Sequence, residues 1–137
     1  MALQYGTTYR TASMTAIATA VTTSGVMVLY AGIKPADCAT PTSGQTVLAT
    51  WTSNATQFGL AVSGVLTVSA PLVATVVGTA GTAAWFGIYP TSTTTNNDRV
   101  IQGDVAVSGS DWNITNTTIA ASQNVTFTSM TITAFGA

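Results

Sequence analysis

The clearest alternation of apolar and polar positions along the chain lies between Gly81 and Val107. In its first half, two sets of apolar residues alternate and face opposite sides: Ala84, Phe86 and Ile88 against Ala83, Trp85 and Tyr89. In its second half, three apolar residues share a face and two polar residues lie opposite: Ile101, Val105 and Val107 against Gln102 and Asp104. A period of two predicts strands, so we expect a long antiparallel hairpin at the centre of the fold. The connection Pro90–Asn97 is too long for a two-residue turn, and we expect an exposed, mobile tip.

A helical spacing occurs near the start of the chain. From Thr11 to about Thr22, four apolar residues fall at i, i+3, i+4 and i+7: Met14, Ile17, Ala18 and Val21. This spacing places them on one face of a helix. The segment is short and rich in Thr, so the helix needs packing against a sheet in order to persist. Residues 1–10 are expected to form an irregular arm, and Ser24-Gly25 is expected to end the helix.

The segments that follow predict further strands. Val26–Tyr30 is apolar at every position, which predicts a strand covered on both faces, by the helix on one side and by the core on the other. Gly32–Gly44 contains two prolines and is expected to be a long loop. Two later strands each place three apolar residues on one face: Val47, Ala49 and Trp51, then Leu66, Val68 and Ala70 after Gly64. Between them, Phe58 is expected to anchor the loop Thr52–Gly59 inward.

The C-terminal part of the chain predicts shorter pieces. Pro71 cannot donate to a ladder, so a bend or an edge position is expected before the strand Leu72–Val77. Ser108–Asp111 is predicted to be a turn, followed by a short strand around Trp112 and Ile114 and an apolar anchor at Ile119. The last strand, Asn124–Ala134, changes phase between two apolar pairs: Val125 with Phe127, then Met130 with Ile132. Both pairs can face one core only if an extra residue intervenes, so we expect a β-bulge or sharp bend near Thr128-Ser129.

Together these patterns predict a mainly β fold with about eight short strands and one short N-terminal helix. Turn-forming residues recur roughly every 8–12 residues, which favours an antiparallel two-sheet sandwich of jelly-roll or Ig-like order. The expected organisation is an N-terminal arm over residues 1–10 and a single β-sandwich domain over residues 11–137. The order of the strands does not follow from the sequence.

Charge changes the picture of the surface. Only 5% of the residues are charged, against roughly 25% in an ordinary soluble domain, and the formal net charge is −1. The three basic residues, Arg10, Lys34 and Arg99, are too few and too dispersed for a nucleic-acid partner. Residues 11–31 carry no charge, but Thr and Ser interrupt them and no membrane segment is predicted. Because charge depletion marks interface cores, we favour a protein whose surface is covered by neighbours in an assembly over a hydroxyl-coated soluble domain.

The residues needed for catalysis or metal binding are scarce. The chain has no histidine and no glutamate, and Cys38, its one cysteine, is interpreted as a small loop filler. Of the four aspartates, Asp98, Asp104 and Asp111 could converge on calcium with loop carbonyls. The preferred interpretation is that Asp98 and Asp111 form turns and that Asp104 points outward, since no Asp-x-Asp-x-Asp-Gly loop is present. No catalytic, cofactor-binding or metal residue is therefore predicted, no cofactor is expected, and the protein is expected not to be an enzyme.

Five aromatic residues admit two interpretations: Trp51, Trp85, Trp112, Tyr30 and Tyr89. They could line a carbohydrate groove, but each carries a large apolar area, and such rings in a small sandwich are more often core or interface anchors. Core or interface is the preferred interpretation. Burial of the three tryptophans in the free protein would remove the carbohydrate alternative.

From Arg10 onward the sequence resembles a family of small tailed-phage virion proteins. The resemblance begins with the helical segment Thr11–Val21, the strand end Val28-Leu-Tyr-Ala-Gly32 followed by Pro35, and Leu48-Ala-Thr-Trp51. Its most specific parts are four later segments: Thr79-Ala-Gly-Thr-Ala-Ala-Trp-Phe-Gly-Ile88, Gly103-Asp-Val-Ala-Val-Ser-Gly-Ser-Asp111, Asn113-Ile-Thr-Asn-Thr-Thr-Ile119 and Val125–Thr133. These motifs are turns and strands without catalytic content. The family tends to have a tight Asp/Gly turn where this chain has its Thr/Asn tip.

The resemblance implies a virion structural protein. The preferred version is a capsid decoration or cement protein that is assembled in the host cytoplasm, binds the major capsid protein and forms a homo-oligomer. Residues 1–10 or the long loops are the expected shell contacts. A tail, neck or baseplate component is the alternative within this class, and a host-carbohydrate-binding module is the alternative outside it.

Overall fold

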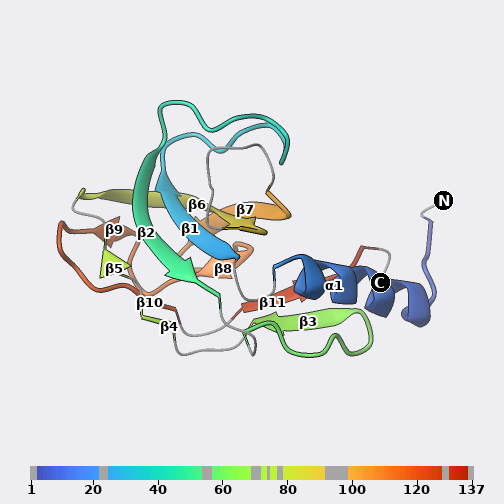
Figure 1. Cartoon of the computed structure of the whole chain (residues 1–137). Helices are drawn as coiled ribbons and strands as arrows, with labels where there is room; N and C mark the ends of the chain where they lie inside the picture. The colour runs from blue at the N-terminus through green and yellow to red at the C-terminus, as the bar shows by residue number, and fades with distance from the viewer. Residues whose placement is uncertain are drawn as a thin grey trace.

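The chain is mainly β with one helix in the part that the computed structural model describes, which comprises residues 3–21, 25–53, 57–68, 72–73, 75–76, 79–91, 99–127 and 130–135 (Figure 1). A main sheet of seven strands has this order: β5 (Thr75–Val76), β2 (Thr46–Thr52), β1 (Val26–Ala31), β6 (Gly81–Tyr89), β7 (Ile101–Ala106) and β8 (Trp112–Asn113), with β9 (Thr118–Ile119) also paired to β6. Two ribbons of two strands each accompany it: β4 (Leu72–Val73) with β10 (Thr126–Phe127), and β3 (Val65–Val68) with β11 (Met130–Thr133).

The predicted central hairpin is confirmed. β6 and β7 pair antiparallel from Trp85 opposite Asp104 to Ile88 opposite Ile101. Phe86 and Ile88 face the main core, and Trp85 and Tyr89 lie in a second cluster on the opposite face, as their alternation predicted. Most of the predicted tip, residues 92–97, lies outside the described part of the chain.

Three side chains of the main sheet do not take the face that the sequence predicted. Two of them are displaced by β-bulges, and the third lies beyond the end of its strand. The register of β1 shifts against both of its neighbours, and the shifts leave Leu48 and Ala84 as extra residues. Each bulge reverses the side-chain parity beyond it, since successive side chains point to opposite faces. Val47 therefore packs on the second cluster instead of with Trp51, and Ala83 joins the main core. Val107 follows the end of β7 and is exposed, although it was predicted to share a face with Val105.

The prediction of a wholly antiparallel sheet is wrong at one place. β8 runs parallel to β7, with Val105 opposite Trp112 and Ala106 opposite Asn113. The link between them, residues 107–111, loops back so that β8 lies alongside β7 in the same direction, and Gly109 within it is left-handed at φ +74°. The Asp111 carboxylate also holds the link, because it accepts the Asp104 N–H at 2.9 Å.

β1 is buried on both faces, as its unbroken apolar run predicted. The main core covers one face, and the other face carries the second cluster, formed by Val26, Val28, Tyr30, Trp85 and Tyr89. The predicted role of the helix is wrong here, because α1 (Thr7–Ala20) packs on β3 instead of β1. Residues 32–45, which contain no strand, lie on the side of the second cluster and are held there by hydrogen bonds from Arg99 and Gln102.

The helix begins at Thr7, four residues before the predicted Thr11, so part of the expected arm is helical. No apolar stripe marks this first turn in the sequence. Met14 is buried and Ile17 and Ala18 are partly buried against Leu66 and Ala134, as the spacing predicted. The Thr-rich composition is accommodated because Thr15 and Thr19 donate their hydroxyls to carbonyls four residues earlier, at 2.9 Å each.

The β-bulge or bend predicted near Thr128-Ser129 lies outside the described residues, but the paired strands on either side of it differ in register. β11 pairs with β3 from Met130 opposite Val68, and β10 pairs with β4 from Phe127 opposite Leu72. Between these paired stretches the chain has two residues on one side, 128–129, and three on the other, 69–71. The register therefore shifts by one residue, and Val125 and Met130 both reach the main core despite their opposite parity.

Figure 1 shows that α1, β3 and β11 extend together to one side of the main sheet, with the N-terminus at the far end of the helix. We call this unit the lobe. It is joined to the main sheet through a shared core, because Val68 and Met130 belong to the same buried cluster as Leu29, Trp51 and Phe86.

Candidate interaction surfaces

The aspartates considered for calcium do not form a metal site in the described part of the chain. Asp104 forms a salt bridge with Lys34 at 2.8 Å, and Asp111 accepts the backbone N–H of Asp104. Asp98 lies outside the described residues. No group of three or more potential metal ligands occurs among the residues that the structure describes.

The aromatic side chains considered for a carbohydrate groove are buried. Trp51, Trp85 and Trp112 are 0–2% exposed, and Tyr30 and Tyr89 are 0–3% exposed. Trp112 contacts Trp51 and Phe86 edge-to-face, at centroid distances of 5.4 and 5.7 Å. These five rings are core residues, so they cannot form a sugar-binding platform in this structure.

The burial of the tryptophans gives a direct spectroscopic prediction. Trp51, Trp85 and Trp112 should give blue-shifted fluorescence that acrylamide quenches only weakly in the native protein, because no indole is open to water. Unfolding in urea should shift the emission to the red and restore quenching in one transition. Strong quenching of the native protein would contradict the packing described above.

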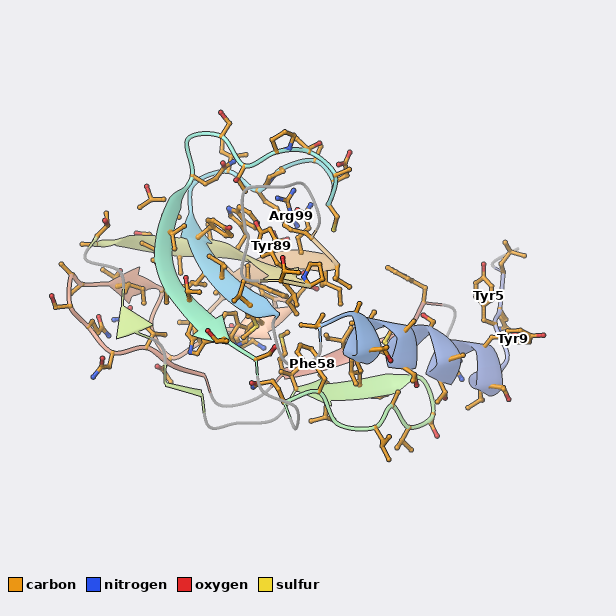
Figure 2. The ribbon with its side chains drawn as sticks, viewed as in Figure 1. Tyr5, Tyr9, Phe58, Tyr89 and Arg99 are labelled. Carbon is orange, nitrogen blue, oxygen red and sulfur yellow. The ribbon has the colours of Figure 1, made fainter. Side chains whose placement is uncertain are left out.

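Arg99 occupies the most unusual environment in the described part of the molecule. Its side chain is 5% exposed, and no carboxylate of the described residues forms an ion pair with it. The guanidinium carbon lies 5.7 Å from the ring centroid of Trp85 and 6.0 Å from that of Tyr89. A buried cation must be compensated, and here ring faces and carbonyl oxygens replace the missing carboxylate. Figure 2 shows Arg99 directly beside Tyr89.

The carbonyl oxygens that compensate Arg99 come from residues 32–45, which we call the latch loop. Arg99 Nη2 donates to the carbonyls of Asp37, at 2.9 Å, and of Thr40, and Arg99 Nε donates to Gln102 Oε1 at 3.0 Å. Gln102 Nε2 in turn donates to the Pro35 carbonyl at 2.9 Å. Together with the salt bridge from Lys34 to Asp104, these contacts hold the latch loop against β7 and over the second cluster.

The second cluster also contains a buried pair of phenols. Tyr30 stacks on Trp85 with a centroid distance of 4.1 Å and an interplanar angle of 10°. Its hydroxyl lies 2.7 Å from that of Tyr89. Burial, and then the hydrogen bond to Tyr89, raises the pKa of the Tyr30 phenol far above its ordinary value. The Tyr30 phenol therefore remains neutral, and the contact between the two hydroxyls is a structural hydrogen bond.

Asp37 shapes the part of the latch loop that binds Arg99. Its Oδ1 accepts the Thr40 hydroxyl and the N–H groups of Thr40 and Ala39, at 2.7–2.9 Å. These hydrogen bonds, led by the Thr40 hydroxyl, hold the pKa of Asp37 below its ordinary value. Because the folded pKa is lowered, the stabilisation is present above the unfolded pKa and is lost as the pH falls through the folded pKa.

A pH titration tests this turn. Below the ordinary range of an aspartate pKa, protonation of Asp37 should weaken the turn, and the amide resonances of Ala39 and Thr40 should shift together in an NMR titration. Asp37→Asn should remove this titration at the two amides. Asp104→Asn serves as the control, because its carboxylate is bound outside the turn and its removal should leave the midpoint at Thr40 unchanged.

Exposed apolar side chains gather on the lobe. Eight large apolar residues among those described are exposed, and six of them lie on the lobe or on the segments that lead into it: Leu3, Tyr5, Tyr9, Leu60, Val62 and Phe135. The other two, Ile33 and Val107, lie in the latch loop and after β7. Figure 2 shows Tyr5 and Tyr9 together at the N-terminal end of α1, far from Arg99.

Two adjoining hollows lie beside these side chains. One, of about 360 Å³, is formed by Tyr5, Tyr9, Arg10, Ser13, Ala134 and Phe135. The other, of about 600 Å³, is bounded by α1, β11 and the start of β7, and it shares Ser13 and Phe135 with the first. We call the second hollow the β7–β11 groove. Its apolar walls include Met14, Ile17, Phe86, Ile101 and Ile132, and polar side chains such as Gln102, Asp111 and Thr131 line the rest.

Comparisons of the chain with models of protein families, with curated proteins and with solved structures find no match. No helix among the described residues has both the length and the apolar character required to cross a membrane. The surfaces above therefore rest on the structure of this chain alone.

Sequence reasoning did not identify either the Arg99 cluster or the apolar lobe. Arg99 was counted only as one of three basic residues, and the exposure of Tyr5, Tyr9 and Phe135 depends on where the helix and the last strand lie. One indication was available for the lobe: Leu3 and Tyr5 alternate with Gln4 in a segment with no predicted partner.

Proposed function

We propose that this chain is a structural protein of a phage virion, acting as a capsid decoration or cement protein that binds the outer shell and stabilises contacts between capsomers. The observation that carries the proposal is the surface: six large apolar side chains are exposed on the lobe and the segments that adjoin it, in a chain with only 5% charged residues. Exposed apolar patches and depleted charge are typical of surfaces that bind other proteins. The resemblance of residues 79–88, 103–111 and 125–133 to small virion proteins supports the same assignment.

On this proposal, the partners are the major capsid protein and further copies of this chain, and the protein resides in the virion after assembly in the host cytoplasm. No nucleic-acid or membrane partner and no enzymatic activity are proposed. We also infer a two-sheet sandwich of jelly-roll or Ig-like type. This inference is supported by the main core, which is shared between the main sheet and the β3–β11 ribbon.

The experiment is to locate the protein in purified particles. We expect quantitative mass spectrometry to find it at a copy number comparable with that of the shell subunits, and low-resolution imaging to place it on the outer shell. Purified protein should also rebind shells that lack it and raise their melting temperature. A few copies confined to the tail, neck or baseplate would replace the decoration role with the alternative, and absence from the particle would reject both.

A further inference from the structure

The β7–β11 groove follows the edges of two strands and not their faces. Four consecutive residues line it from each of two segments: 100–103 at the start of β7, and 130–133 of β11. Successive residues of a strand point to opposite faces, so a hollow that contacts four in a row runs along an edge. β11 pairs with β3 on one side only, and β7 pairs with β8 only at Val105 and Ala106, within the described part of the chain. Such edges accept an added strand.

A segment that fits this groove lies on the same lobe. Residues 3–6 precede the helix without regular structure, and the backbone at Gly6 is extended, with φ −59° and ψ 150°. Leu3 is 83% exposed and Tyr5 is 55% exposed, with Gln4 between them. This alternation would direct both apolar side chains to one face of a strand. Four extended residues span about 13 Å, the same length as the four-residue edge of β11.

We propose that residues 3–6 of one copy lie along the β11 edge in the β7–β11 groove of a second copy. The exposed segment leads into α1, and α1 and β11 form one side of the groove, so two copies can bind each other through one shared surface.

The exposed area supports a second copy as the occupant. The rings of Tyr5, Tyr9 and Phe135 are 55%, 76% and 92% exposed. At roughly 150–250 Å² for each ring, they expose on the order of 400 Å². A stable dimer buries about 800 Å² per partner, so these three rings alone provide about half of that area, and Leu3 and the groove walls add to it. The inference rests on the homo-oligomer part of the proposed function, but it is tested in solution, without particles.

The first test measures the oligomeric state of the full chain by sedimentation equilibrium across the micromolar range. The wild type should self-associate. The double substitution Leu3→Asp and Tyr5→Asp should weaken association at least about tenfold, as should Phe135→Asp, because each places a charge in the apolar contact. Ile33→Asp and Val107→Asp are matched controls, since these residues are exposed elsewhere, and they should leave association unchanged. A wild type that is monomeric throughout, or controls that dissociate equally, would overturn the proposal.

The second test identifies the contact itself. In a Cys38→Ser background, one variant carries Leu3→Cys and another carries Thr133→Cys. Mixing the two under mild oxidation should give a disulfide between the different chains. A variant with both substitutions that cross-links only within one chain would show that the segment occupies its own groove, which rejects the proposal. If the cross-link forms but the protein is absent from particles, the proposed function fails while this inference stands.

Discussion

Replacing Arg99 with alanine is expected to destabilise the protein by about 3 kcal/mol and to release the latch loop. The substitution removes the donor to the carbonyls of Asp37 and Thr40 and the cation that lies over Trp85 and Tyr89. It also leaves a space beneath a loop that has no strand pairing of its own. Urea unfolding should give the change in free energy, and limited proteolysis should show new cleavage within residues 32–45.

Two variants separate the role of the guanidinium from that of the charge. Arg99→Lys retains the charge but not the planar fork that serves three acceptors, so an intermediate loss is expected. Lys34→Ala removes a partly exposed salt bridge from the same loop, and a loss below about 1 kcal/mol is expected. If Arg99→Ala and Lys34→Ala had equal effects, the buried cation would not be what holds the latch loop.

The substitution Gly103→Ala should be nearly as damaging, at about 2–3 kcal/mol, although it adds a single methyl group. A Cβ at this position would lie 2.7 Å from Phe86 Cε1 and 2.9 Å from Asp111 Oδ2. The Phe86 ring packs edge-to-face against Trp112 in the main core, so moving it away from a new methyl group would disturb that contact. We expect a lower urea midpoint and a changed near-ultraviolet circular dichroism spectrum, since the environment of Trp112 would be altered.

Gly59→Ala is the matched control for this substitution. A Cβ there would lie 3.8 Å from the Thr67 carbonyl oxygen, which is an ordinary contact. Its effect should stay within about 0.5 kcal/mol, as for other substitutions away from close contacts. A Gly103→Ala protein as stable as the Gly59→Ala protein would mean that Phe86 has more room than the structure gives it.

Prediction from the sequence succeeded where the apolar pattern within one strand is enough to define which of its faces are buried. The alternation in Gly81–Tyr89 predicted both the central hairpin and the opposite faces of Trp85 and Phe86. The unbroken apolar run of Val26–Tyr30 predicted a strand buried on both sides. These patterns succeed because burial on one or two faces of a strand dictates the period of its apolar residues.

Prediction failed where the pairing or packing depends on two segments that lie far apart in the sequence. The bulges at Leu48 and Ala84 arise from pairing with β1, so nothing local to either residue reveals them. The helix was predicted to cover β1, but its partner is β3, because the apolar stripe around Met14 specifies burial and not the surface that provides it. The parallel pairing of β8 depends likewise on Asp111 binding back to β7.

The candidate surfaces were the least predictable. Arg99 acquires its role from carbonyls 59 and 62 positions away in the chain. The exposed end of the lobe is defined by residues near both ends of the sequence, Tyr5, Tyr9 and Phe135. The predicted absence of catalytic and metal residues concerned residue types alone and stays a prediction.

The pairing of β3 with β11 has a consequence for how the protein is made. Helix α1 is synthesised before β3 and β11, yet Met14 packs against Leu66 and Ala134, and the Ala134 N–H donates to the Gly64 carbonyl at 2.9 Å. The apolar face of the helix therefore stays incompletely covered while the ribosome adds the intervening residues, at about 5–20 per second. During that interval the nascent chain presents a short amphipathic helix to chaperones and to neighbouring chains. The helix is thus made before the residues that complete its packing.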